Sequence, residues 1–155
     1  MHVYTLERET VVPLPLRETF AFFEDPQNLA RITPPWLAFR IGTADRIQMR
    51  RGAEIRYMIR WLGIPVRWTT VITDYDPPYS FVDTQASGPY LFWRHLHTFV
   101  ETDSATRVRD CVDYALPFGW LGRLAHRLMV RKQLDQIFNY RQQALTEILG
   151  MTTAK

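Results

Sequence analysis

Two histidines, His95 and His97, lie two residues apart in the segment WRHLHTF (93–99). Imidazole is the side chain best suited to proton transfer near neutral pH, and it is also a common metal ligand. Side chains of a β-strand alternate between the two faces of a sheet, so a His-x-His pair on a strand places both rings on one face. The chemistry of the pair therefore depends on which side chains lie opposite it.

The segment 106–116 supplies a carboxylate, Asp110, that could lie opposite the histidines. Residues 90–102 and 106–116 both have the composition of strands, and the polar residues between them favour a hairpin turn. The simplest hairpin pairs His97 with Asp110, and the Cβ atoms of such cross-strand neighbours lie about 5 Å apart. A register slipped by two residues would pair Asp110 with His95, so both pairings stay open.

Further residues of the same predicted face complete a polar group inside an aromatic wall. Alternation along 79–86 directs Asp83 and Gln85 inward. Buried carboxylates are costly unless they are paired, so we expect these groups to have partners or to face a wet cavity. The predicted aromatic residues of the wall are Tyr57, Trp68, Trp93, Phe99 and Tyr114.

Four interpretations of the polar group remain open. It could be structural, with histidines and aspartates satisfying each other's hydrogen bonds. It could orient an oxygen of a ligand in an otherwise apolar pocket. It could perform general acid–base catalysis through His97 and Asp110, the aspartate orienting the imidazole and tuning its pKa. It could bind a metal through His95, His97 and Asp110. Since His2 and His126 lie in other predicted elements and no second cysteine exists, we predict neither a metal nor another cofactor.

The elements that must position these residues are a series of strands with two short helices, followed by one long helix. The predicted strands are 2–12, 37–41, 53–62, 64–75, 79–86, 90–102 and 106–116, and the predicted short helices are 16–23 and 25–32. From Gly119 to Leu149 the apolar residues follow a helical period. The predicted apolar stripe of this helix is Leu121, Leu124, Leu128, Leu134, Ile137, Phe138, Leu145 and Ile148. A helix of about 30 residues is about 45 Å long, so it must lie across a large sheet.

Composition places the chain among ordinary globular proteins with an aromatic excess. The 155 residues are 46% hydrophobic and 14% aromatic, with a net charge of +3. We predict one domain over 1–150 and a disordered tail over 151–155. The single cysteine, Cys111, the charged N-terminus and the lack of a long apolar run lead us to expect a cytoplasmic protein.

Four segments resemble the START-like, or SRPBCC, superfamily: TPPWLAFRI (33–41), GIPVRWTTVITDYDPP (63–78), FVDTQASGPYLFWRHLHTF (81–99) and YALPFGWLGRLAHRLMVRKQLDQIFNYR (114–141). This group includes polyketide cyclase/dehydrase-like proteins, lipid-transfer START domains and Bet v 1-like proteins. The resemblance implies an α+β helix-grip fold, in which a curved antiparallel sheet wraps around a long C-terminal helix. In this fold, a hydrophobic cavity lies between the sheet and the helix. The resemblance does not identify a ligand or a reaction.

We therefore predict a carrier or sensor that binds an apolar or amphipathic small molecule between the sheet and the long helix. The alternative is a cofactor-independent cyclase or dehydratase that uses His97 and Asp110. Arg123, Arg127 and Arg131, spaced by four, form one basic helix stripe that is either a solvated face or a contact for an anionic group or a membrane surface. We predict no nucleic-acid partner, and the sequence leaves the oligomeric state open.

Overall fold

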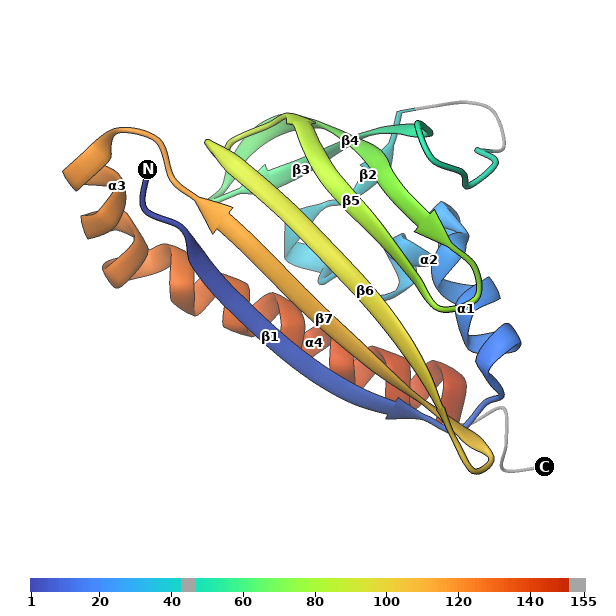
Figure 1. Cartoon of the computed structure of the whole chain (residues 1–155). Coiled ribbons are helices and arrows are strands. Elements are labelled where there is room, and N and C mark those ends of the chain that lie inside the picture. The colour runs from blue at the N-terminus through green and yellow to red at the C-terminus, as the bar shows by residue number, and fades with distance from the viewer. Residues whose placement is uncertain (43–46, 151–155) are drawn as a thin grey trace.

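A curved antiparallel sheet and a long helix lying along it make up most of the fold (Figure 1). The computed structural model describes residues 1–42 and 47–150, so the predicted tail 151–155 lies outside the described residues. The sheet order is β1-β7-β6-β5-β4-β3-β2, which confirms the predicted meander and adds β1 beside β7. The strands are β1 Tyr4–Val12, β2 Arg40–Ile41, β3 Glu54–Trp61, β4 Ile64–Asp76, β5 Ser80–Ser87, β6 Phe92–Thr102 and β7 Ala105–Ala115.

Two short helices, α1 (Leu16–Glu24) and α2 (Pro26–Arg31), follow β1 as predicted. Asp25 separates them and starts α2, because its carboxylate accepts a hydrogen bond from the backbone N–H of Gln27 at 2.9 Å. Such a cap satisfies an N–H that has no partner within the helix. A 3-10 turn, η1 (Pro35–Leu37), then leads to β2.

The C-terminal helix is continuous but not uniform. It begins as α3 (Gly119–Ala125), widens into a π-helical turn, η2 (His126–Val130), and continues as α4 (Arg131–Gly150). Figure 1 shows α4 lying along the sheet, while α3 lies past the end of β7, close to the N-terminus. Gly122 allows α3 to fold back tightly, because a Cβ at this position would collide with the carbonyl oxygen of Pro117.

The predicted apolar stripe is correct for α4 and wrong for the first turns of the helix. Leu134 and Leu145 are buried, whereas Leu121, Leu124 and Leu128 are 52%, 46% and 67% exposed. Gly122, His126 and Val130 form the buried face of α3 and η2, and these leucines are turned away from it. Within the described residues, no helix is long and apolar enough to cross a membrane.

The predicted register of the last hairpin is confirmed. Phe99 pairs with Val108, His97 with Asp110, His95 with Val112, and Trp93 with Tyr114. The alternation of β6 therefore determines the order of residues along the inner face, which runs from aromatic to histidine to aromatic. The core is divided accordingly: one apolar cluster contains Phe20, Phe23, Phe81, Phe99, Leu145 and Leu149, and the other contains Trp68, Tyr90, Trp93, Tyr114, Leu134 and Phe138.

Candidate functional site

A cavity of about 180 Å³ lies between the sheet and α4. Its wall is largely apolar and includes residues of α1, α2, β3 to β6 and α4. The inner face of β3 contributes Ile55, Tyr57, Ile59 and Trp61 to this wall. Of the ten residues predicted to bind a ligand, six line it: Tyr57, Trp68, Asp83, Trp93, His95 and His97.

The other four predicted residues lie outside the cavity wall. Phe99 packs in the core against the rings of α1, and the hydroxyl of Tyr114 is hydrogen-bonded to His126 Nε2 at 2.8 Å. Asp110 lies behind the two histidines. The amide of Gln85 donates to the carbonyl of Tyr90 at 2.8 Å and accepts from its N–H at 3.2 Å. Gln85 thus stabilises the turn between β5 and β6 and does not face the cavity.

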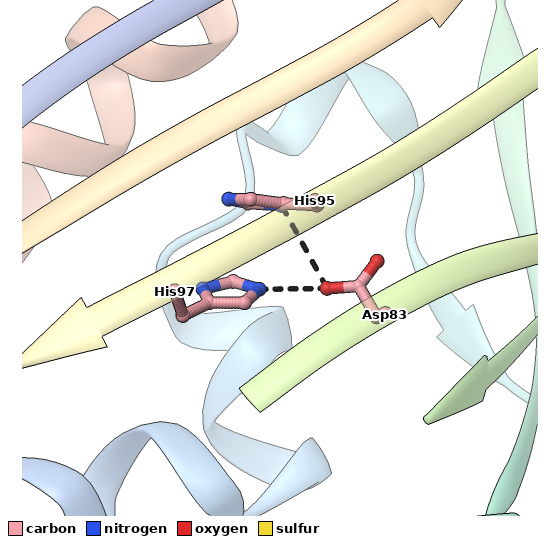
Figure 2. A group of neighbouring side chains, drawn as sticks. All are labelled: Asp83, His95 and His97. Carbon is pink, nitrogen blue, oxygen red and sulfur yellow. Dashed lines mark hydrogen bonds and ion pairs between the residues drawn. The ribbon is translucent and has the colours of Figure 1, made fainter. Parts of the chain in front are cut away.

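A polar cluster lies between the two apolar clusters, and its short hydrogen bonds run diagonally across the strands. His95 Nε2 lies 2.8 Å from Asp110 Oδ1, and His97 Nε2 lies 2.6 Å from Asp83 Oδ2 (Figure 2 shows the latter pair). The rings of His95 and His97 stack with their centroids 3.7 Å apart. The register therefore follows the first predicted pairing, while the shortest contact of Asp110 is with His95. The members of the polar cluster are Asp83, His95, His97, Asp110 and Arg141.

Both ring nitrogens of His97 face carboxylates. Nε2 contacts Asp83, and Nδ1 lies 3.3 Å from Asp110 Oδ1. An ionised carboxylate only accepts hydrogen bonds, so Nε2 carries a proton, while Arg141 Nη2 lies 3.5 Å from Nδ1. Burial alone would lower the pKa of His97, but the hydrogen bonds to Asp110 and Asp83 outweigh burial and raise the pKa above its ordinary value. The two carboxylates therefore favour the protonated form of His97.

His95 has the opposite character. Its Nε2 donates to Asp110, whereas its Nδ1 lies 3.7 Å from Asp83 Oδ2, which is too far for a hydrogen bond. Burial and then the neighbouring His97 lower the pKa of His95 below its ordinary value, against the opposing effect of the aspartates. His95 is therefore a neutral imidazole, and its Nδ1 lone pair can accept a proton or a hydrogen bond at the cavity wall.

Arg141 on α4 completes the polar cluster, and sequence analysis missed it. Its Nη2 lies 3.2 Å from Asp110 Oδ1, and its side chain is 9% exposed. Burial would raise the pKa of Asp110, but Arg141 and the two histidine hydrogen bonds hold the pKa well below its usual range. Asp83 behaves similarly: burial opposes ionisation, and interactions with His95 and His97 lower its pKa nonetheless. Arg141 and the two histidines thus stabilise the ionised forms of both aspartates.

Asp83, His95 and His97 also have the residue types of a metal site, and one ligand atom from each lies within 4.8 Å of the others. Two histidines and one carboxylate can hold iron or zinc. Their geometry does not fit a metal, because His97 Nε2 is already hydrogen-bonded to Asp83 and the stacked rings differ in plane by only 28°. The nitrogen lone pairs of nearly parallel rings cannot meet at one point, so both rings would have to rotate.

Two buried donors of the cavity wall, Trp68 Nε1 and Arg141 Nε, have no hydrogen-bond partner among the described residues. Buried donors are usually paired, so an unpaired N–H at a cavity marks a place for an acceptor. Trp68 is 5% exposed and Arg141 is 7% exposed. Burial, followed by the charge of Asp83, raises the pKa of Tyr57 well above its ordinary value, so its hydroxyl keeps its proton.

The family of the chain follows from a sequence match that covers most of this fold. A family model for polyketide cyclases/dehydrases and lipid-transport proteins matches residues 12–145. The chain belongs to this family. Ligand binding and cyclase/dehydrase chemistry both occur in it, but membership specifies neither a ligand nor a reaction for this member. Among curated proteins, no sequence matches the chain.

Solved structures of other proteins share this fold. TTHA0849 from Thermus thermophilus superposes with a TM-score of 0.72 at 17% identity, over 97% of this chain and 100% of that one. A START superfamily protein from Mycobacterium smegmatis gives 0.70 at 14% identity, over 96% and 99%. The ZhuI aromatase/cyclase from Streptomyces sp. R1128 gives 0.68 at 15% identity, over 95% and 96%. At these identities the likeness concerns the helix-grip fold alone.

Proposed function

We propose that the protein binds a small, largely apolar molecule that carries at least one acceptor oxygen. The observation that supports this function most directly is the pair of unpaired donors, Trp68 Nε1 and Arg141 Nε, on residues that line a largely apolar cavity. A ligand carbonyl or carboxylate would give either donor the partner that it lacks within the described residues.

The size of the cavity narrows the ligand further. A volume of about 180 Å³ is close to that of a cavity of about 150 Å³ known to hold benzene. A molecule with one substituted ring therefore fits without rearrangement, whereas a long acyl chain requires the wall to open. Aromatic side chains such as Trp68 and Trp93 suit a flat ring.

Two probes of matched shape test this proposal. Acetophenone and ethylbenzene have similar size, but only acetophenone has an acceptor oxygen. We expect acetophenone to bind more tightly, and titrations followed by tryptophan fluorescence and by protein NMR would measure the difference. One hydrogen bond contributes about 1 kcal/mol, which corresponds to about a fivefold preference.

Substitution of the donor gives the decisive comparison. Trp68→Phe keeps a ring and removes the N–H, so we expect it to reduce the preference for acetophenone while ethylbenzene still binds. Trp36→Phe is the matched control, because Trp36 is 53% exposed and does not line the cavity. The proposal is wrong if neither probe binds and native mass spectrometry of the purified protein finds no bound compound. If Trp68→Phe kept the full preference for acetophenone over ethylbenzene, Trp68 Nε1 would not be the donor to the ligand oxygen.

A second function is favoured by the free lone pair of His95. An imidazole oriented by Asp110 and lining an apolar cavity has the arrangement of a general base. It would remove a proton from a carbon next to a ligand carbonyl, as cyclisation and dehydration both require. The predicted catalytic pair was His97 and Asp110, but both nitrogens of His97 are engaged with carboxylates, so we assign the base to His95.

Proton exchange at the methyl group of acetophenone in D₂O isolates this step, because the C–H proton moves to His95 Nδ1 and a deuteron returns. If the protein is an enzyme of this type, NMR will detect exchange that His95→Gln abolishes and Asp110→Asn slows. Binding of acetophenone without exchange would leave the binding function alone.

A further inference from the structure

The first turns of the C-terminal helix carry an apolar surface that the fold does not cover. Phe118 is 81% exposed, Trp120 65% and Met129 49%, and the three exposed leucines of α3 and η2 adjoin them. We call this set of residues the outer helix surface. Isolated exposed apolar residues are common, but a contiguous group marks a place of contact. The residues of the outer helix surface are Phe118, Trp120, Leu121, Leu124, Leu128 and Met129.

The outer helix surface points away from the body of the protein. The buried face of this segment is formed by Gly122, His126 and Val130, which are spaced by four. Leu124 and Leu128 each follow one of these residues by two positions, which is about 200° around an α-helix. Leu124 and Leu128 are therefore turned away from this buried face and stay exposed, while Trp120 and Leu124 also line a hollow beside Tyr4.

The segment is anchored without the outer helix surface. His126 is 6% exposed, its ring stacks on Tyr4 with centroids 3.5 Å apart, and its Nε2 is hydrogen-bonded to the hydroxyl of Tyr114. Tyr114 lies on β7 and Tyr4 on β1, so two strands position the turn. The exposed leucines therefore stay on a fixed helix and are free to contact something else.

Basic residues lie beside the apolar stripe. Arg123, Arg127 and Arg131 line one shallow hollow together with Trp120 and Tyr4. No acidic residue occurs between Asp113 and Asp135 in the sequence. Within residues 1–42 and 47–150, none of these arginines, nor Lys132, forms an ion pair, while the nearby Asp135 is paired with Arg8 at 2.6 Å. The hollow therefore presents unpaired positive charge.

We propose that α3 and η2 dock the protein on an anionic lipid bilayer. The arginines and Lys132 would contact lipid phosphates, and Trp120 with the leucines would enter the boundary between head groups and acyl chains. A bilayer accounts for both properties, since a nucleic acid gives the leucine stripe no partner. A helix with interleaved cations and apolar side chains has the composition of an interfacial segment, and its charge is complementary to an anionic surface. This inference is independent of the cavity.

Vesicle sedimentation tests the proposal with the intact protein. We expect binding to vesicles of phosphatidylcholine mixed with phosphatidylglycerol, weaker binding to phosphatidylcholine alone, and release by salt. Each basic residue near such a surface contributes about fivefold in affinity, so Arg123→Gln/Arg127→Gln should weaken binding by about 25-fold. Arg60→Gln/Arg67→Gln is the matched control, because both residues are exposed on the other side of the sheet.

Trp120→Ser tests the apolar half, with Trp36→Ser as its control. We expect Trp120→Ser to weaken vesicle binding and Trp36→Ser to leave it unchanged. All six substitutions are at exposed positions, and circular dichroism would verify that the fold persists. The proposal is overturned if the intact protein does not bind anionic vesicles, or if control and test variants lose affinity equally. A dimer that Trp120→Ser dissociates, without vesicle binding, would assign the outer helix surface to a second copy of the chain.

Discussion

Arg141→Met should destabilise the protein more than any surface ion-pair substitution. Arg141 and Asp110 have side chains 9% and 6% exposed, with Nη2 and Oδ1 3.2 Å apart. Methionine keeps much of the stem that packs near Phe23 and Phe138 but leaves the carboxylate of Asp110 buried without its guanidinium. Removing one partner of a buried pair costs about 3–5 kcal/mol of the free energy of unfolding.

The cost of breaking an ion pair depends on the burial of its two side chains more than on the distance between them. Arg8 and Asp135 are closer, at 2.6 Å, but their side chains are 27% and 40% exposed. Exposed pairs contribute about 0–1 kcal/mol, so Arg8→Met should cost far less than Arg141→Met. Urea unfolding followed by tryptophan fluorescence at neutral pH measures both free energies. A loss in Arg141→Met no larger than that in Arg8→Met would refute the reasoning.

A double-mutant cycle and an acid titration separate charge from packing. Arg141→Met/Asp110→Asn should recover part of the loss, because the uncompensated carboxylate is gone, and additive losses would show that the pair is not coupled. The pKa of Asp110 is lowered in the fold, so its stabilisation is present above the unfolded pKa and is lost as pH falls through the folded value. The charge of Arg141 is the largest single effect that lowers the pKa of Asp110. The loss of stability at acid pH should therefore begin at a higher pH in Arg141→Met than in the unsubstituted protein.

NMR titration of the imidazole rings should give a pKa for His97 above about 6.5 and for His95 below it, and the same direction in both would contradict the assigned protonation states. The stabilisation from His97 should be complete below its unfolded pKa and be lost as pH rises through its folded value. Phe99→Ala should lower the free energy of unfolding by about 3–5 kcal/mol in thermal and urea melts, because Phe99 is 2% exposed. Gln85→Ala should cost about 1–3 kcal/mol through the unpaired backbone of Tyr90, and altered binding of acetophenone would show that Gln85 does face the cavity.

The strands and their inward faces follow from local rules, and this explains why sequence analysis predicted them. A period of two places His95 and His97 on one face, and the length of the turn determines that Asp110 lies opposite His97. The hydrogen bonds do not follow this register: Asp110 bonds to His95, and Asp83 bonds to His97. These diagonal contacts depend on side-chain rotamers. Rotamers follow from the surrounding packing, which the sequence of one hairpin does not contain.

The errors in the helix have another origin. Arg141 interrupts the buried stripe of α4, which contains Leu134, Phe138, Arg141 and Leu145 at intervals of four, three and four residues. The buried position of Arg141 could therefore have been predicted from this spacing. The exposure of Leu128 could also have been found, because it lies six residues before Leu134, which is about 240° around an α-helix, so the two do not share a face.

The protein contains a second buried histidine site, His126, and the comparison favours a functional interpretation of the polar cluster. His126 packs on Tyr4, its Nε2 is hydrogen-bonded to Tyr114, and it lines the hollow of the arginines and not the cavity of the polar cluster. The polar cluster instead leaves His95 Nδ1 and Arg141 Nε without hydrogen bonds at the wall of a cavity. A buried charge network is often no more stable than apolar residues of the same volume. Stability alone is therefore a weak explanation for the polar cluster, and under the proposed function a ligand oxygen would accept a hydrogen bond from Arg141 Nε.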